Sequence, residues 1–461
     1  METTEIKPKE GKRKILVFLL CLILSCGLCL IVREPGFTAS QTYVLFILFF
    51  SIALWFTEVI PPFAVGLLII SFLVFSLGNR HFNPHPEKID LYVTTFSSSI
   101  IWLLLGGFFI AVAMTKTGLD KDLLQLTIRI SGTKPRSLLI GLMSTTMLAS
   151  MLMSNTATTA MVIASVMPLL KKLGKESGLT KAILLGVSIS AVTGGLGTII
   201  GTPPNALAAG ALEQAGIKMD FLTWIIYGMP VALVLTAVTC LVLILLFVKD
   251  NKPLNLSFLN EEKQIQNPQQ TIQKRIVISV LIVTVLMWLT GSIHGITVAA
   301  VSAIPLVLLT LTKVLDGGDV RAMPWDTLLL VAGGLSLGLA LQHTGLMDHY
   351  ALKISNLHMS STVILIVFGF ATMLFSNIMS NTATSTVLIP LGMAILPAMK
   401  TEICMVIGMA ASTALFLPVS TPPNAIAYST GLIEQKDFRV GGLLIGLLGP
   451  SLIILWVLLI S

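Results

Sequence analysis

The sequence is poor in charge. Asp, Glu, Lys and Arg make up 11% of the 461 residues, and hydrophobic residues make up 55%. Soluble globular proteins carry about 25% charged residues. This shortage excludes an ordinary water-soluble enzyme and is typical of a polytopic membrane protein.

Paired cysteines, clustered histidines and catalytic constellations are also missing. The five cysteines all lie in apolar segments, which argues against a disulfide framework. The six histidines have no metal-ligand spacing with cysteines or acids, so no zinc site is expected. No nucleophile, base and orienting group occur together, so the sequence predicts no enzyme and no organic cofactor. The net charge of +7 is spread over short loops, which argues against nucleic acid and indicates cytoplasmic loops.

Long apolar runs dominate the chain. A helix needs about 20 apolar residues to cross the bilayer, and the sequence predicts an all-α membrane protein with eleven transmembrane helices. The predicted spans are residues 15–32, 42–57, 61–78, 97–115, 182–210, 222–248, 276–292, 295–312, 326–342, 402–428 and 440–460. The first follows a basic start but lacks a small-residue cleavage site, so we expect an uncleaved span in a unit of residues 15–41.

Two further apolar stretches, 138–168 and 361–397, are each interrupted by a polar cluster near the middle. Each arm has about 15 residues and rises only about 22 Å as a helix. We therefore expect two re-entrant hairpins that enter and leave the membrane on the same side.

Basic residues are distributed unevenly over the predicted loops. With a cytoplasmic N-terminus (residues 1–14), 23 of the 29 Lys and Arg residues lie inside, as the positive-inside rule requires. An odd number of spans then places the C-terminus outside. Residues 249–275 form the longest polar segment and are predicted to be a cytoplasmic linker between two halves.

The two halves repeat each other in order. Three motifs recur at offsets of 227, 226 and 219 residues: 104–119 at 331–346, Ser-Asn-Thr-Ala-Thr at 154–158 and 380–384, and Thr-Pro-Pro-Asn-Ala at 202–206 and 421–425. The predicted repeats cover 42–248 and 276–461 and begin five spans apart. An odd offset inverts one copy, and inverted repeats with interrupted helices are typical of secondary transporters.

The polar clusters predict four half-helix N-termini near the membrane centre. Ser, Asn and Thr are favoured helix caps, and prolines are tolerated in a first turn. Helix starts are therefore expected at Asn155-Thr156, Thr202, Asn381-Thr382 and Thr421. Each such end carries about +0.5 elementary charge and suits an anion. Neighbouring hydroxyl, amide and carbonyl oxygens suit a hard cation such as sodium.

These motifs resemble those of the divalent anion/sodium symporter family, in particular its bacterial dicarboxylate transporters. The resemblance covers nearly the whole chain after the first span. It implies a dimerising scaffold domain and a transport domain with both hairpins, which moves as an elevator in the bacterial inner membrane. It also implies sodium-driven import of C4-dicarboxylates such as succinate, malate or fumarate.

Carried over by position, the resemblance assigns two overlapping sets of residues. The predicted substrate-binding residues are Ser154, Asn155, Thr156, Thr202, Ser380, Asn381, Thr382 and Thr421. The predicted sodium ligands are Ser150, Ser154, Asn155 and Gly201 for one ion, and Ser376, the backbone near Met379, Asn381 and Ser420 for another.

Other functions remain open at this point. A sodium-independent dicarboxylate exchanger, or a sulfate or tricarboxylate carrier, would use the same fold. An anion channel would need a continuous polar pore, and an intramembrane hydrolase would need a spatial partner for the motif serines.

Overall fold

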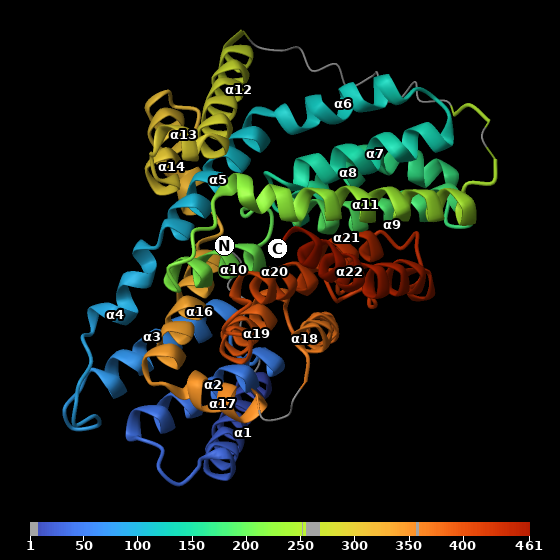
Figure 1. The fold of residues 1–461 in the computed structure, drawn as a ribbon. Coiled ribbons are helices and arrows are strands. Elements are labelled where there is room, and N and C mark those ends of the chain that lie inside the picture. Colours follow the sequence, from blue (N-terminus) through green and yellow to red (C-terminus); the bar gives the residue numbers. More distant parts are fainter. Residues whose placement is uncertain (1–7, 251, 255–267, 356–358) are drawn as a thin grey trace.

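The computed structural model describes residues 8–250, 252–254, 268–355 and 359–461. The part of the chain that it describes is built from helices and connecting turns (Figure 1). The first half contains α1 (Pro8–Val32), α2 (Ala39–Thr57), α3 (Pro62–Leu77), α4 (Asp90–Val93), α5 (Ser99–Thr117), α6 (Leu119–Ser131), α7 (Pro135–Ser150), α8 (Asn155–Leu173), α9 (Gly178–Gly195), α10 (Pro203–Gln214) and α11 (Phe221–Phe247).

The second half repeats this order. It contains α12 (Pro268–Leu289), α13 (Gly291–His294), α14 (Val298–Leu311), α15 (Gly317–Arg321), α16 (Trp325–His343), α17 (Leu346–Ser355), α18 (Ser361–Ser376), α19 (Asn381–Ile395), α20 (Lys400–Ala410), α21 (Pro422–Ser429) and α22 (Phe438–Ile460). Most of the predicted linker, residues 251 and 255–267, lies outside the described residues, and 268–275 begin α12 instead.

Among the described residues, eight helical segments are long and apolar enough to cross a membrane. Seven of them match predicted spans and the eighth, α9, is the first part of the predicted span 182–210, so the chain is an all-helical multi-span membrane protein. The predicted spans 61–78 and 295–312 are the shorter helices α3 and α14. The 16 residues of α3 rise only about 24 Å, because Pro61 and Gly78 bound the helix.

Two predicted spans are wrong as continuous helices. Residues 182–210 are divided between α9 and α10, and residues 402–428 between α20 and α21. Each break is followed by a Thr-Pro-Pro sequence. A proline lacks the backbone N–H and its ring clashes with the carbonyl four residues before it, so a continuous helix cannot run through these prolines without a kink or break. In the second case, residues 402–428, the two helices α20 and α21 have 11 and 8 residues. Both are too short to span the bilayer alone.

The helices form two groups, each drawn from both halves of the sequence. We call α1–α5 and α12–α17 the first group, and α7–α11 and α18–α22 the second group. Within the first, α3 packs on α16 and α14 packs on α5; within the second, α22 packs on α11 and α21 on α9. Figure 1 shows α21 and α22, in red, beside α9 and α11, in green.

Two equivalent helix crossings in the first group bring glycines close to a neighbouring helix. A Cβ atom on Gly333 of α16 would lie 2.3 Å from the Cα of Gly66 in α3. A Cβ atom on Gly106 of α5 would lie 2.9 Å from the Cβ of Ser302 in α14. Small residues let membrane helices approach closely, and Gly333 is 227 positions after Gly106. The same crossing is therefore built twice.

We expect Gly333→Ala to lower the free energy of unfolding by about 1–3 kcal/mol, because the added methyl group must push two backbones apart. Thermal unfolding of the purified protein in detergent measures the effect. Gly27→Ala in α1 is the control, since its new Cβ would meet nothing within 4 Å. Equal unfolding temperatures for the two variants would show that α3 and α16 can move apart at this crossing without loss of stability.

Candidate functional site

The four predicted helix starts are all present. Helices α8 and α19 begin at Asn155 and Asn381, directly after the tips of the two helical pairs α7–α8 and α18–α19. Helices α10 and α21 begin directly after Thr202 and Thr421. The local reason is capping: Ser154 Oγ accepts a hydrogen bond from Ala157 N at 3.1 Å, and Ser380 Oγ accepts one from Ala383 N at 3.2 Å.

The four helix ends differ in the N–H groups that they offer. The first N–H groups of a helix have no intrahelical acceptor, so those of Asn155, Thr156, Asn381 and Thr382 are available to a ligand. Helices α10 and α21 each start with two prolines, which carry no N–H. They contribute a helix dipole but fewer donors, so an anion would form its direct hydrogen bonds mainly with α8 and α19.

An oxygen cluster lies beside the first tip. The Oγ atom of Ser150 lies 2.5 Å from Asn155 Oδ1 and 2.7 Å from the carbonyl oxygen of Ala191. A hydroxyl has only one proton to donate, so three oxygens share one hydrogen, and Ser150 is fully buried. Gly201, the fourth predicted ligand, lies nearby: a Cβ atom on Gly195 would contact both Asn155 Oδ1 and Gly201 O.

The second tip leaves its oxygens without partners. Ser376 Oγ and Asn381 Oδ1 are buried and accept or donate no hydrogen bond within the described structure. Buried polar atoms are nearly always satisfied, so these two atoms indicate a place for a ligand, an ion or water. Ser420 Oγ instead donates to Asn377 Oδ1 at 3.0 Å, and Met379 is half-buried at the tip.

Two asparagines bridge the helix breaks. The sequence indicated them only as part of the Thr-Pro-Pro-Asn motif. Asn205 Nδ2 donates to the carbonyl oxygens of Gly195 and Thr198, both at 2.8 Å. Asn424 Nδ2 donates to the carbonyl oxygens of Leu415 and Leu417, at 3.4 and 3.1 Å. Their duplication in the Thr-Pro-Pro-Asn motif was the signal that could have identified this role.

Two further side chains were missed entirely. Asn377 Oδ1 accepts a hydrogen bond from Phe416 N at 3.1 Å and so ties the second tip to the break between α20 and α21. Thr198 Oγ1 ties the first tip to the equivalent break by donating to Met151 O at 2.5 Å. These contacts join residues far apart in sequence, and no repeated motif marks them.

Each half-helix packs against the hairpin arm of the opposite repeat. Helix α10 contacts α19, and α21 contacts α8. Thr202 and Thr421 are both buried at these helix starts. The two repeats are therefore interleaved through the helices that begin at the predicted site.

The predicted site residues carry no titratable side chain. Their chemistry consists of hydroxyl, amide and carbonyl oxygens and the N–H groups of helix ends. Hard cations prefer the oxygens, and anions prefer the helix N-termini. Such a set can bind ions of both signs, but it offers no acid, base or activated nucleophile.

The comparisons with known proteins agree with this chemistry. A family model described as "Sodium:sulfate symporter transmembrane region" matches residues 12–461. A sodium-dependent dicarboxylate transporter, SdcS of Staphylococcus saprophyticus, is 27% identical over 470 residues, covering 92% of this chain and 87% of that protein. SdcS of Staphylococcus aureus is 29% identical over 447 residues, covering 90% and 84%.

Two solved structures share the fold. MtrF of Neisseria gonorrhoeae, described as an antimetabolite efflux pump, gives a TM-score of 0.55 at 14% identity and covers 86% of this chain and 94% of its own. The YdaH transporter of Alcanivorax borkumensis gives 0.57 at 13% identity, with 86% and 97% covered. At this identity the likeness supports the fold alone.

We expect Asn205→Ala to destabilise the protein more than Asn424→Ala. Removing either carboxamide leaves two carbonyl oxygens without a donor, which costs about 1–3 kcal/mol for each buried group; both acceptors of Asn205 are buried, whereas Leu417 is exposed. The bonds of Asn205 are shorter than those of Asn424. Thermal unfolding in detergent tests the order, and a reversed order would show that the break between α20 and α21 depends more on its asparagine.

Proposed function

The chain belongs to the sodium:sulfate symporter family, a family of transporters and not of enzymes, and from this premise we propose that it imports C4-dicarboxylates together with sodium ions. The observation that carries the proposal is the duplicated tip: a helix start with free N–H groups beside buried oxygens that lack enough protons. The names of the SdcS relatives support the choice of a dicarboxylate and of sodium.

The charges of the site explain the coupling that we propose. Four helix N-termini would supply a nominal charge of about +2 before screening, which matches a dicarboxylate without any Lys or Arg at the tips. Ser150, Ser154, Asn155 and Gly201 would hold one sodium ion, and Ser376, the backbone near Met379, Asn381 and Ser420 another. Each cation offsets the cost of the buried anion, so binding of one favours binding of the other.

The contacts of the two hairpins are unequal, which supports alternating access. Residues on one face of α8 are exposed, whereas those 226 positions later on α19 are largely buried. The exposed positions are Thr156, Ala157, Ala160 and Ala164, and their counterparts are Thr382, Ala383, Thr386 and Pro390. Helix α19 packs on α16, α17 and α2 of the first group, while the principal contacts of α8 are with α6, α7, α9 and α21.

Glycines of the first group show a second difference between the repeats. A Cβ atom on Gly334 of α16 would lie 2.9 Å from Thr386 of α19. Its counterpart, Gly107 of α5, instead faces Ile200 in the break between α9 and α10. The equivalent glycines therefore face different parts of the second group, the arm α19 in one case and the break between α9 and α10 in the other. We propose that the second group moves as an elevator along the first.

The direction of opening follows from the predicted orientation. The loops around α8, residues 116–136 and 171–181, carry nine basic residues and would face the cytoplasm. The exposed face of α8 then opens inward, and the buried face of α19 closes the outer side. The proposal includes an inner-membrane location, a cytoplasmic N-terminus and a homodimer formed by the first group, as the family resemblance implies.

We expect purified protein in liposomes to accumulate labelled succinate when an inward sodium gradient is present. Asn155→Ala and Asn381→Ala should each abolish this uptake while the protein stays folded, because each removes an oxygen shared by cation and anion sites. Uptake is measured by filtration, and folding by thermal unfolding in detergent.

Ser165→Ala is the matched control, since that hydroxyl bonds only to Met161 O within its own helix. Uptake that ignores sodium but needs dicarboxylate inside the liposomes would identify an exchanger instead. Uptake of sulfate or citrate in preference to succinate would retain the fold and replace the substrate. Normal sodium dependence in both asparagine variants would show that the sites lie elsewhere.

We also expect unequal cysteine accessibility on the two hairpins. In a background lacking the exposed Cys26, Ala160→Cys should react with a membrane-impermeant maleimide applied from the cytoplasmic side. Thr386→Cys should stay unreactive from either side while the described state persists, because Thr386 is 2% exposed. Equal labelling of both positions would contradict the closed packing of α19 against α16.

A further inference from the structure

A separate cavity lies between the two helix groups, on the α19 side. Its volume is about 390 Å³, within the range of small-molecule sites, and it is bounded by α10, α16, α17, α19 and the start of α20. Inward, the gap narrows to about 10 Å³ between Leu207, Leu335 and Thr386, room for about one water molecule. The cavity is thus a pocket at the closed seam and contains none of the predicted site residues.

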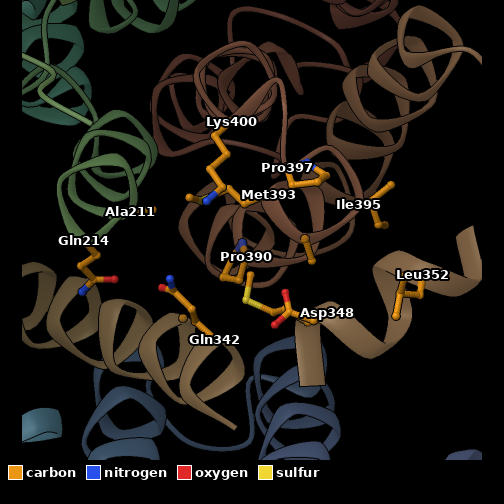
Figure 2. Close-up of a pocket in the computed structure, with 13 residues that line it drawn as sticks. Ala211, Gln214, Gln342, Asp348, Leu352, Pro390, Met393, Ile395, Pro397 and Lys400 are labelled. Atoms are coloured by element: carbon orange, nitrogen blue, oxygen red, sulfur yellow. The ribbon is translucent and has the colours of Figure 1, made fainter. Parts of the chain in front are cut away.

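Three nitrogen-bearing side chains reach into this cavity. Figure 2 shows Lys400 approaching it from one side and Gln214 and Gln342 from the other. Gln214 Nε2 makes only a long hydrogen bond, 3.4 Å, to Leu335 O, and no hydrogen bond of the Gln342 side chain is found in the described part of the chain. The cavity therefore offers several unused N–H donors.

Lys400 has no opposite charge beside it in the described part of the chain. Lys400 is half-buried and is the first residue of α20, where the helix dipole disfavours a cation. No carboxylate of the described residues lies within 4 Å of its Nζ. Asp348, in contrast, is exposed in the first turn of α17, where a negative charge is favoured.

The remaining walls set the shape of the ligand. They are mostly apolar side chains, among them Met347, Leu352, Pro390 and Met393. A carboxylate would pair with Lys400, the two glutamines would offer further N–H donors, and an aliphatic chain would cover the apolar wall. A second carboxylate would lie either against that apolar wall, where its charge would be poorly solvated, or near Asp348, which would repel it. The dicarboxylates proposed above therefore do not fit this cavity.

We propose that this cavity binds an amphipathic monocarboxylate, with its carboxylate on Lys400 and its chain against α17 and α19. Such a ligand contacts α16 and α17 of the first group and α10, α19 and α20 of the second. It therefore holds the seam closed and slows the movement that transport requires. This last step rests on the proposed function, whereas the binding itself does not.

Equilibrium binding of labelled octanoate to the full-length protein in lipid nanodiscs tests the site, with empty nanodiscs subtracted. We expect saturable binding that Lys400→Gln weakens about tenfold, as expected for a charge-assisted hydrogen bond, and that Lys400→Arg retains. Asp348→Asn should strengthen binding, because it removes a like charge. Lys218→Gln is the matched control, since it removes an exposed lysine that the cavity does not include.

Equal affinity in the wild type and Lys400→Gln overturns the site, as does octanedioate binding as tightly as octanoate. The second measurement is sodium-driven succinate uptake with octanoate outside. We expect inhibition in the wild type and none in Lys400→Gln, and undiminished uptake at saturating octanoate overturns the bridging role. If the wild type takes up no succinate at all, the proposed function fails while the binding result stands.

Discussion

Unpaired backbone groups in the membrane interior are the constraint on which this structure depends. A broken helix leaves carbonyl and N–H groups that lipid cannot satisfy. Asn205 and Asn424 meet this need by donating to two carbonyl oxygens each across the breaks. Their own Oδ1 atoms remain buried without a partner. The residues that make the breaks tolerable therefore also place unsatisfied oxygens beside the half-helix starts.

A sequence with repeated motifs forms an asymmetric structure here. The equivalent glycines Gly107 and Gly334 have different neighbours, Ile200 in one case and Thr386 in the other. Of the two hairpin arms that begin at the tips, α19 packs on α2, α16 and α17 of the first group, whereas the principal contacts of α8 are with α6, α7, α9 and α21. In the proposed mechanism, two similar seams are closed alternately, so the repeat itself supplies the two end states of transport.

Local rules predicted the helix starts but not the tertiary contacts. Capping by Ser154 and Ser380 and the sterics of Thr-Pro-Pro act within a few residues, so the sequence alone located α8, α10, α19 and α21. Continuous apolar composition, in contrast, does not show that a helix ends at Gly195 or Ala410, and both spans were predicted as too long. The bonds of Asn377 to Phe416 and of Thr198 to Met151 span 39 and 47 residues. Only the folded chain reveals them.

The prolines that follow the breaks determine which helix ends can donate N–H groups to an anion. Helices α10 and α21 lack N–H groups at their first two positions, so in the proposed mechanism an anion takes its direct hydrogen bonds mainly from α8 and α19. On the first tip, Asn155 supplies both the amide oxygen of the buried cluster and the first N–H of α8. In the proposed mechanism a cation on that oxygen and an anion on that helix start are neighbours on one residue. Coupling then needs no relay through the protein, because each ion lowers the electrostatic cost of the other directly.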